Sequence, residues 1–150
     1  MKWKLASFSE LSTKELYDIL ALRQDVFILE QRCPYPDLDY RDHKAEHLMG
    51  VLDGKIVAYL RLLPKDLPYT GAISFGRVLT AKSVRGQGVG KELIEQVLSY
   101  LEKNNNTLPI VISAQLYLEK FYQSFGFKSL GEAYDEDNIP HIKMKRDAKK

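Results

Sequence analysis

The segment of the chain with the clearest chemical character is a basic, glycine-rich stretch at residues 75–91. An apolar strand-like run leads into it, and an amphipathic helix pattern begins among its glycines. The start of a helix has unpaired N–H groups and the positive end of the helix dipole, and both favour an anion. Glycines there remove side chains that would keep a phosphate group away from the backbone. The residues that would hold the anion are Lys82, Arg85, Gly86, Gly88, Gly90 and Lys91.

Two familiar phosphate-binding patterns do not fit this stretch. The P-loop requires Gly-x-x-x-x-Gly-Lys-Ser/Thr, and the dinucleotide fingerprint requires Gly-x-Gly-x-x-Gly in an early βαβ unit. The spacing Gly86-x-Gly88-x-Gly90 matches neither pattern, which argues against a nucleotide-phosphate binding domain. The structural alternative is a glycine-rich turn that only allows a helix to pack closely against a strand.

The pattern Arg85-x-x-Gly88-x-Gly90 resembles the Gln/Arg-x-x-Gly-x-Gly/Ala motif of the GCN5-related N-acetyltransferase (GNAT) superfamily. In that family the loop binds the pyrophosphate of acetyl-CoA, and the preceding strand pairs its backbone with the pantetheine arm. The resemblance implies one GNAT-fold domain over residues 1–150, an α/β protein with a mixed, twisted sheet flanked by helices. The sheet is expected to splay between its two central parallel strands. The implied cofactor contacts are Val78, Leu79, Thr80, Arg85, Gly86, Gln87, Gly88, Val89, Gly90 and Lys91.

A second motif lies at residues 115–127. It resembles the family pattern Asn-x-x-Ala-x-x-x-Tyr-x-x-x-Gly-Phe, with Tyr122 on the tyrosine. Gln115 stands where asparagine is usual and is a further candidate cofactor contact, and Leu118 replaces alanine. A phenol with a pKa near ~10 can protonate a departing alkyl thiolate, whose pKa is ~8.5, so Tyr122 is the candidate general acid. The alternative is an ordinary aromatic residue of an amphipathic helix.

The resemblance extends over most of the chain and narrows to one branch of the family. The run Leu22-Arg23-x-x-Val26-Phe27-x-x-Glu30-Gln31-x-Cys33-Pro34-Tyr35-x-Asp37-x-Asp39 is similar to the N-terminal signature of ElaA-like GNAT proteins. The resemblance implies transfer of an acetyl group from acetyl-CoA, the co-substrate, to a primary amine by direct attack. A non-catalytic acyl-CoA-binding sensor or interaction module is the alternative.

Two acidic segments outside the regular elements are candidates for the acceptor side. Their carboxylates would attract a cationic acceptor, either a small amine or a lysine-like side chain, and take its proton. The alternative is that these acids are ordinary solvated loop residues. The acceptor-side candidates are Glu30, Asp37, Asp39, Glu136 and His141.

The elements that must position these residues follow from hydrophobic periodicity. Ser12 and Glu15 form a capping box at the start of the first helix, and Asp53-Gly54 predicts a tight hairpin turn. Gly126 suits the left-handed position after the last helix. Helices are predicted at 12–28, 88–103 and 116–125, and strands at 3–7, 47–52, 55–62, 72–80, 108–114, 127–134 and 141–146.

Composition narrows the remaining classes of protein and of binding site. A chain of 150 residues has the size of one domain, and its single cysteine, Cys33, excludes an intrachain disulfide and a paired-cysteine zinc site. We expect no metal, and a buried structural thiol rather than a nucleophile at Cys33. The basic excess lies at 143–150 and indicates a solvated tail, so no nucleic-acid partner is expected. Without a secretory signal or a run of about 18 apolar residues, we expect no membrane partner and a cytoplasmic location. A homodimer is left open.

Overall fold

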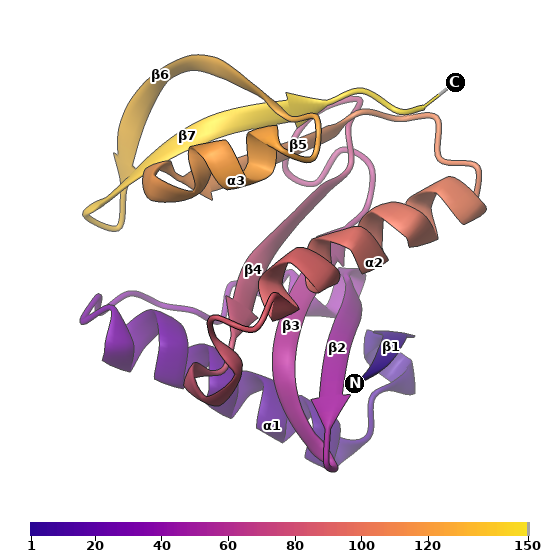
Figure 1. Ribbon diagram of the computed structural model, residues 1–150, viewed down its shortest axis with the longest axis vertical. Coiled ribbons are helices and arrows are strands. Elements are labelled where there is room, and N and C mark those ends of the chain that lie inside the picture. Colours follow the sequence, from indigo (N-terminus) through magenta and orange to yellow (C-terminus); the bar gives the residue numbers. More distant parts are fainter. Residues whose placement is uncertain (150) are drawn as a thin grey trace.

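The strands of the N-terminal half form one antiparallel sheet. The computed structural model describes residues 1–149, and this sheet has the strand order β1-β2-β3-β4 (Figure 1). Asp53 and Gly54 join β2 to β3 with φ angles of 51° and 77°, which confirms the predicted tight turn. The strands are β1 (Lys2–Ser7), β2 (Glu46–Leu52), β3 (Lys55–Leu63) and β4 (Ser74–Thr80).

The C-terminal strands form a second antiparallel sheet, and this corrects the sequence-based fold. The sequence predicts one mixed sheet with two central parallel strands. Within residues 1–149, parallel pairing is limited to a single bridge between Ile73 and Ile110, where the Ile73 N–H donates to the Pro109 carbonyl (3.0 Å). The strands of the second sheet, in the spatial order β5-β7-β6, are β5 (Ile110–Gln115), β6 (Lys128–Glu136) and β7 (Ile139–Arg146).

A bulge in β4 explains why β4 and β5 separate beyond that bridge. While β3 advances two residues from Tyr59 to Arg61, its partner β4 advances three. The extra residue lies at Arg77–Val78, and Arg77 has a φ of 51°. A bulge bends its strand and increases the local twist, so β4 turns away from β5 (Figure 1).

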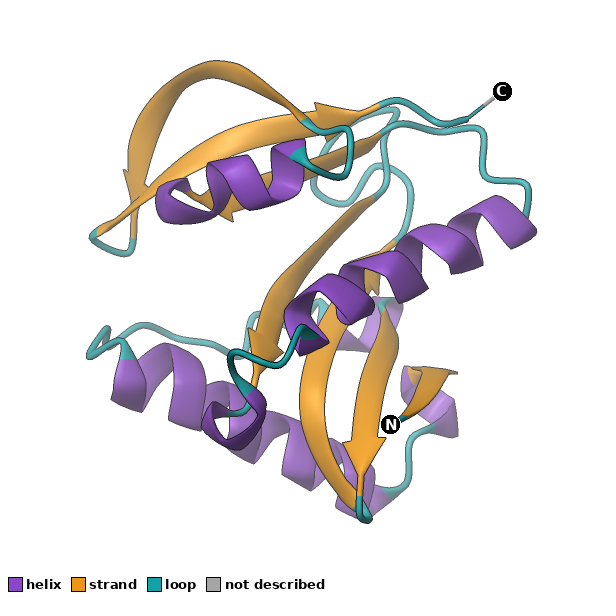
Figure 2. Cartoon of the chain, viewed as in Figure 1, coloured by secondary structure: helices purple, strands orange, loops and turns teal. Residues whose placement is uncertain are grey.

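Two helices cover opposite faces of the first sheet. Side chains alternate along a strand, so the adjacent cross-strand pairs Leu48–Leu60 and Met49–Tyr59 face opposite sides. The first pair packs in the core beneath α2 (Val89–Lys103), whereas the second packs against α1 (Thr13–Arg23). Figure 2 shows the two helices on either side of these strands.

The first helix is shorter than predicted and changes its geometry. Its capping box is confirmed, because the Glu15 N–H donates to the Ser12 hydroxyl (3.0 Å) and the Ser12 N–H donates to the Glu15 carboxylate (2.9 Å). The α-helix ends at Arg23 and continues as π-helical turns over Gln24–Glu30. A bond from the Cys33 N–H to the Ile28 carbonyl (3.2 Å), five residues apart, follows these wide turns.

The third predicted helix divides into two pieces. A 3-10 turn at Leu116–Leu118 precedes α3 (Glu119–Gln123), so the α-helical part is half of the predicted 116–125. Gly126 follows with a φ of 88°, as predicted. None of the helices within residues 1–149 combines the length and the apolar character that crossing a membrane requires.

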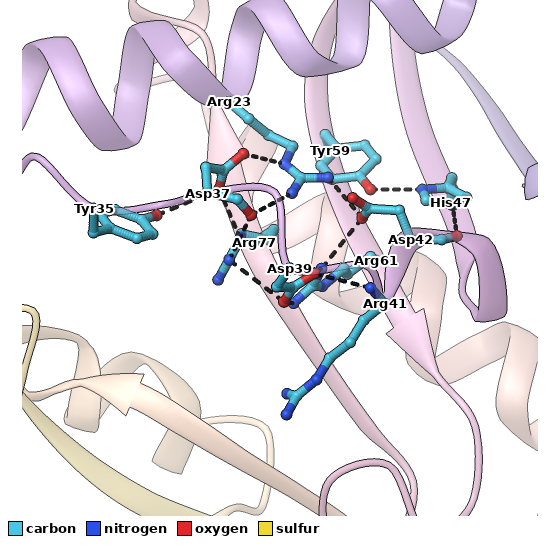
Figure 3. Close-up of polar contacts among 10 residues, drawn as sticks. All are labelled: Arg23, Tyr35, Asp37, Asp39, Arg41, Asp42, His47, Tyr59, Arg61 and Arg77. Carbon is cyan, nitrogen blue, oxygen red and sulfur yellow. Dashed lines mark hydrogen bonds and ion pairs between the residues drawn. The ribbon is translucent and has the colours of Figure 1, made fainter.

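A buried cluster of ion pairs ties α1 and the irregular segment after it to the first sheet (Figure 3). The Arg23 side chain is 0% exposed, and it donates to Asp37 (Nε to Oδ2, 2.9 Å) and to Asp42 (Nη1 to Oδ1, 2.7 Å). Because a buried cation without a partner is strongly unfavourable, these carboxylates are held in place. The arginine–aspartate cluster consists of Arg23, Asp37, Asp39, Asp42, Arg61 and Arg77.

His47 and Tyr59 brace this cluster without adding charge. His47 Nε2 lies 2.9 Å from the Asp42 carbonyl oxygen, and its Nδ1 lies 2.6 Å from the Tyr59 hydroxyl. A carbonyl only accepts, so Nε2 carries the proton and Nδ1 accepts from the phenol. Burial lowers the pKa of His47 and raises the pKa of Tyr59, so both side chains stay neutral.

Replacing Asp42 by asparagine should lower the free energy of unfolding by about 3–5 kcal/mol, because it leaves buried arginine charge unpaired. Burial acts to raise the pKa of Asp42, but the ion pairs with Arg23 and Arg61 bring it below its ordinary value of 3.8. The carboxylate's contribution is therefore complete above that ordinary value and disappears as pH falls through the lowered folded-state pKa. Urea unfolding should show the gap between wild type and variant closing in this acid range.

The matched control is Asp25→Asn, because Asp25 is an exposed acid on the adjoining π-helical turns. It should change the free energy of unfolding by no more than about 0.5 kcal/mol. A loss in Asp42→Asn as small as that of the control would contradict the role assigned to the cluster.

Candidate active site

A cleft of about 870 Å³ lies where β4 and β5 diverge. The π-helical turns, α3 and the turn between β6 and β7 complete its walls. The predicted site residues that line it are Glu30, Val78, Leu79, Thr80, Arg85, Gly90, Gln115, Tyr122, Glu136 and His141. The predicted site residues outside its lining are Asp37, Asp39, Gly86, Gln87, Gly88, Val89 and Lys91.

The glycine-rich turn lies next to the cleft at the start of α2. Gly86 and Gly88 both have a φ of 79°, a conformation that other residues adopt only with strain. Gly88 is the N-terminal cap of α2 and has no side chain to satisfy the first N–H groups. A Cβ atom at either glycine would meet nothing within 4 Å, so the space in front of the turn is open. Of the other predicted residues here, Gln87 and Lys91 are exposed, whereas the Val89 side chain is buried in the core.

Arg85 links this turn to the wall of the cleft. Its guanidinium donates to the Thr80 carbonyl from Nε (3.2 Å) and Nη2 (3.0 Å), and its Nη1 lies 2.7 Å from Glu30 Oε2. Both charged side chains remain partly exposed, at 40% for Arg85 and 34% for Glu30. An anion that enters this end of the cleft therefore meets a guanidinium that a carboxylate already orients.

Tyr122 reaches the cleft from α3 and is almost wholly buried, with 3% of its surface exposed. It packs edge-on against Phe121 and Phe127, with ring centroids 5.1 Å and 5.8 Å away. This burial, with a smaller effect of Tyr117, raises the pKa of Tyr122 above its ordinary value of 10.0. The phenol is therefore protonated near neutral pH and can donate a hydrogen bond to a group in the cleft.

Glu136 and His141 lie together at the opposite side of the cleft. His141 Nδ1 lies 2.7 Å from the Ile139 carbonyl, and because a carbonyl only accepts, this nitrogen carries a proton. In the neutral ring, Nε2 is then free to accept, and it lies 3.4 Å from Glu136 Oε2. The pair can accept one proton and stabilise the resulting imidazolium.

Asp37 and Asp39, predicted on the acceptor side, belong to the arginine–aspartate cluster instead (Figure 3). Asp37 lies between Arg23 and Arg77, with Oδ1 2.8 Å from Arg77 Nε. Burial acts to raise the pKa of Asp39, but its bonds to Arg61 bring that pKa far below the ordinary value of 3.8. Their charges are therefore compensated within the protein.

Several cleft residues were not predicted as site residues from the sequence. Arg61 and Arg77 lie within apolar strand patterns, and a charged residue in a buried strand is itself a signal of a buried partner. Tyr69 comes from the loop before β4, where no periodic pattern marks it. The lining residues of this kind include Tyr35, Arg41, Arg61, Tyr69 and Arg77.

Cys33 joins two walls of the cleft. Its thiol is buried and donates to the carbonyl oxygen of Asp137 (2.8 Å), which lies in the turn between β6 and β7. This contact connects the irregular segment after α1 with the C-terminal sheet. It gives the thiol a structural role, as the sequence favours.

The solved structure of an acyl-CoA N-acyltransferase from Pseudomonas aeruginosa matches the chain with a TM-score of 0.91 and 41% sequence identity. The match covers 97% of this chain and 98% of that one. Two sheets that diverge around a cleft, with a glycine-rich helix start beside it, thus place the chain in the class of α/β proteins with an N-acyltransferase fold.

The chain belongs to the GNAT acetyltransferase family. The family described as "Acetyltransferase (GNAT) domain" matches residues 27–148. Protein ElaA of Escherichia coli (strain K12) is 39% identical over 149 residues, which are 98% of this chain and 97% of that protein. The crystal structure of Escherichia coli ElaA matches with a TM-score of 0.90 and 38% identity, over 97% of this chain and 99% of that one. The resemblance to the ElaA-like branch of the family is therefore confirmed.

Alanine substitutions at Gly88 and Gly90 should change stability in opposite directions. Gly88→Ala places a Cβ at a φ of 79°, so it should lower the free energy of unfolding by about 1–2 kcal/mol. Gly90→Ala lies within α2, its Cβ would be 4.0 Å from Thr80 Cγ2, and it should raise that free energy by about 0.5–1 kcal/mol. Chemical denaturation of both variants checks this, and equal effects would contradict the left-handed cap.

Proposed function

We propose that the protein is an N-acyltransferase that moves an acetyl group from acetyl-CoA to a primary amine. The observation that carries this proposal is the glycine-rich turn opening beside a cleft that runs between β4 and β5 to Tyr122. The pyrophosphate would bind the N–H groups at Gly86 to Gly90, assisted by Arg85 and Lys91. The pantetheine arm would lie along Val78 to Thr80 in the space where the two strands splay, with Gln115 on the opposite wall.

The bulge in β4 suits the reacting carbonyl. Arg77 and Val78 have no register partner in β3, and a backbone N–H near Val78 would serve a ligand there. An N–H aimed at the thioester oxygen stabilises the negative charge that develops there as the amine attacks. Holding the two reactants together in the cleft supplies a further part of the rate.

The proton balance uses both sides of the cleft. A cationic acceptor first loses one proton to the His141–Glu136 pair and becomes a neutral amine. The amine nitrogen then bonds to the acetyl carbon, the carbon–sulfur bond breaks, and the second proton of the nitrogen leaves with the CoA sulfur. Tyr122 donates a hydrogen bond to the departing thiolate of CoA. The pKa of Tyr122 lies above the ~8.5 of a free alkyl thiol. The phenol therefore transfers its proton only to a thiolate that its removal from water has made more basic than the phenol.

Acetyl-CoA should raise the melting temperature, because a ligand that binds only the folded state stabilises it. At about 100 times its dissociation constant the gain is about 2.7 kcal/mol, or roughly 5–10 °C for a chain of this size. Gly88→Asp should abolish the shift, since it places bulk and negative charge in the open space before the turn. Thermal unfolding with and without acetyl-CoA measures this.

Gly54→Asp is the matched control for that experiment. Gly54 has a φ of 77° and open space around it, so the substitution causes similar strain, but it lies in the β2–β3 hairpin outside the cleft lining. This variant should keep the full shift with acetyl-CoA. If ATP or NAD stabilises the wild type and acetyl-CoA does not, the proposed cofactor is wrong.

Tyr122→Phe should lower kcat by on the order of 100-fold at neutral pH and leave the affinity for acetyl-CoA nearly unchanged. The loss should shrink as pH rises above the thiol pKa of ~8.5, because CoA can then leave as the thiolate without receiving a proton. CoA release measured with a thiol reagent gives kcat. Tyr117→Phe, at an exposed tyrosine that also lines the cleft, is the control and should be close to wild type.

An unchanged kcat in Tyr122→Phe would reduce the ring to a packing role. The sensor alternative would be supported if acetyl-CoA binds but no amine raises CoA release above hydrolysis.

A further inference from the structure

A binding site for a purely cationic acceptor requires uncompensated negative charge, and the charges in and around the cleft do not provide it alone. Within the arginine–aspartate cluster, three arginines face three aspartates, so the cluster as a whole is neutral. Two of the acids that the sequence predicts at the acceptor mouth, Asp37 and Asp39, are thus already compensated. The uncompensated charge at this end of the cleft therefore comes from side chains outside the cluster.

Arg41 is a cation next to the cluster that does not take part in its ion pairs. Its backbone N–H donates to Asp39 Oδ1 (3.1 Å), which fixes the main chain, while its side chain extends away from the cluster (Figure 3). Arg41 lines the cleft, and among residues 1–149 no carboxylate forms an ion pair with its guanidinium. A half-buried arginine without an anion keeps its donors available to a ligand.

A negative charge lies near Arg41 without neutralising it. Glu136 also lines the cleft, and the side chain that it approaches is His141 (Oε2 to Nε2, 3.4 Å), with no ion pair to Arg41 within residues 1–149. Burial and the neighbouring Tyr134 and Glu136 raise the pKa of Tyr69, and Arg41 acts in the opposite direction, so both charges lie close to this ring. Arg41, Tyr69 and Glu136 all line one cleft, so a single ligand can meet both charges there.

We propose that the acceptor is a zwitterion, a small molecule with a primary amine and a carboxylate, and that Arg41 binds the carboxylate. This inference rests on the proposed N-acyltransferase function. The amine lies toward Glu136 and His141, where it loses its proton and attacks the thioester. The planar guanidinium offers two parallel N–H donors, which match the two oxygens of a carboxylate.

The same arrangement disfavours simple amines and polyamines. A diamine would place its second ammonium group against Arg41, and an alkylamine would cover the guanidinium without supplying an acceptor. Leaving the charged guanidinium without water and without an acceptor costs more free energy than the alkyl contact contributes. Specificity therefore arises from this desolvation penalty as well as from the bond between the guanidinium and the carboxylate.

The test compares ω-amino acids of increasing chain length with n-alkylamines of matched length, at saturating acetyl-CoA, with CoA release as the signal. The best amino acid should exceed its matched alkylamine by at least about 10-fold in kcat/KM. Arg41→Gln should reduce that ratio by about 10- to 100-fold, and Arg41→Lys by less, since lysine keeps the charge but loses the fork. Lys44→Gln removes an exposed charge just outside the cleft and should leave the ratio unchanged.

A second variant separates specificity from chemistry. Glu136→Gln should lower kcat/KM for amino acids and alkylamines alike, so the ratio between them should change little. Thermal unfolding of Arg41→Gln should match that of the wild type, because no ion pair within residues 1–149 is lost.

The two failures are distinguishable. If alkylamines equal amino acids and Arg41→Gln leaves their ratio unchanged, the zwitterionic acceptor is refuted while the N-acyltransferase function stands. If no amine of either series promotes CoA release although acetyl-CoA raises the melting temperature, the proposed function fails and the acceptor inference fails with it.

Discussion

The burial of the Arg23 guanidinium is the constraint on which the rest of the site depends. A cation at 0% exposure requires carboxylates, and Asp37 and Asp42 can reach it only if the irregular segment after the π-helical turns folds back over the sheet. That path brings Arg41 to the cleft and sets Asp37 against Arg77 on the bulged part of β4. The irregular segment thus has a defined shape without regular secondary structure, because electrostatic pairing takes the place of a hydrogen-bonded ladder.

The two ends of the cleft differ in how they handle charge. At the glycine-rich turn, backbone N–H groups and Arg85 offer positive potential in an open, exposed setting. At the other end, charge is partly buried and mostly paired, so small differences in a ligand have larger electrostatic effects. Tyr122 lies between them in an aromatic setting, where its phenol is the polar group that remains among packed rings.

Local sequence patterns predicted the local structure well. The capping box at Ser12, the hairpin at Asp53-Gly54 and the left-handed Gly126 each depend on a few adjacent residues, and each is present. Pairings between distant residues could not be predicted in the same way. The partner of Asp39 is Arg61, 22 positions away, and no periodicity encodes that contact. Likewise the separation of β4 from β5 beyond the Ile73–Ile110 bridge follows from a bulge at Arg77, which strand propensities do not reveal. The acids therefore looked like a solvated mouth, although two of them are internal counterions.

The contact between Arg85 and Glu30 means that an anion at Arg85 meets a carboxylate of the protein that shares the same guanidinium. An anion that took the Nη1 donor of Arg85 would leave the Glu30 carboxylate, now 2.7 Å from it, facing the cleft uncompensated. The cleft wall thereby gains a negative charge at the moment its far end is filled. By thermodynamic reciprocity, a cation that the released Glu30 attracts must strengthen the hold on the anion by the same factor. Binding in one half of the cleft would in this way be coupled electrostatically to binding in the other half.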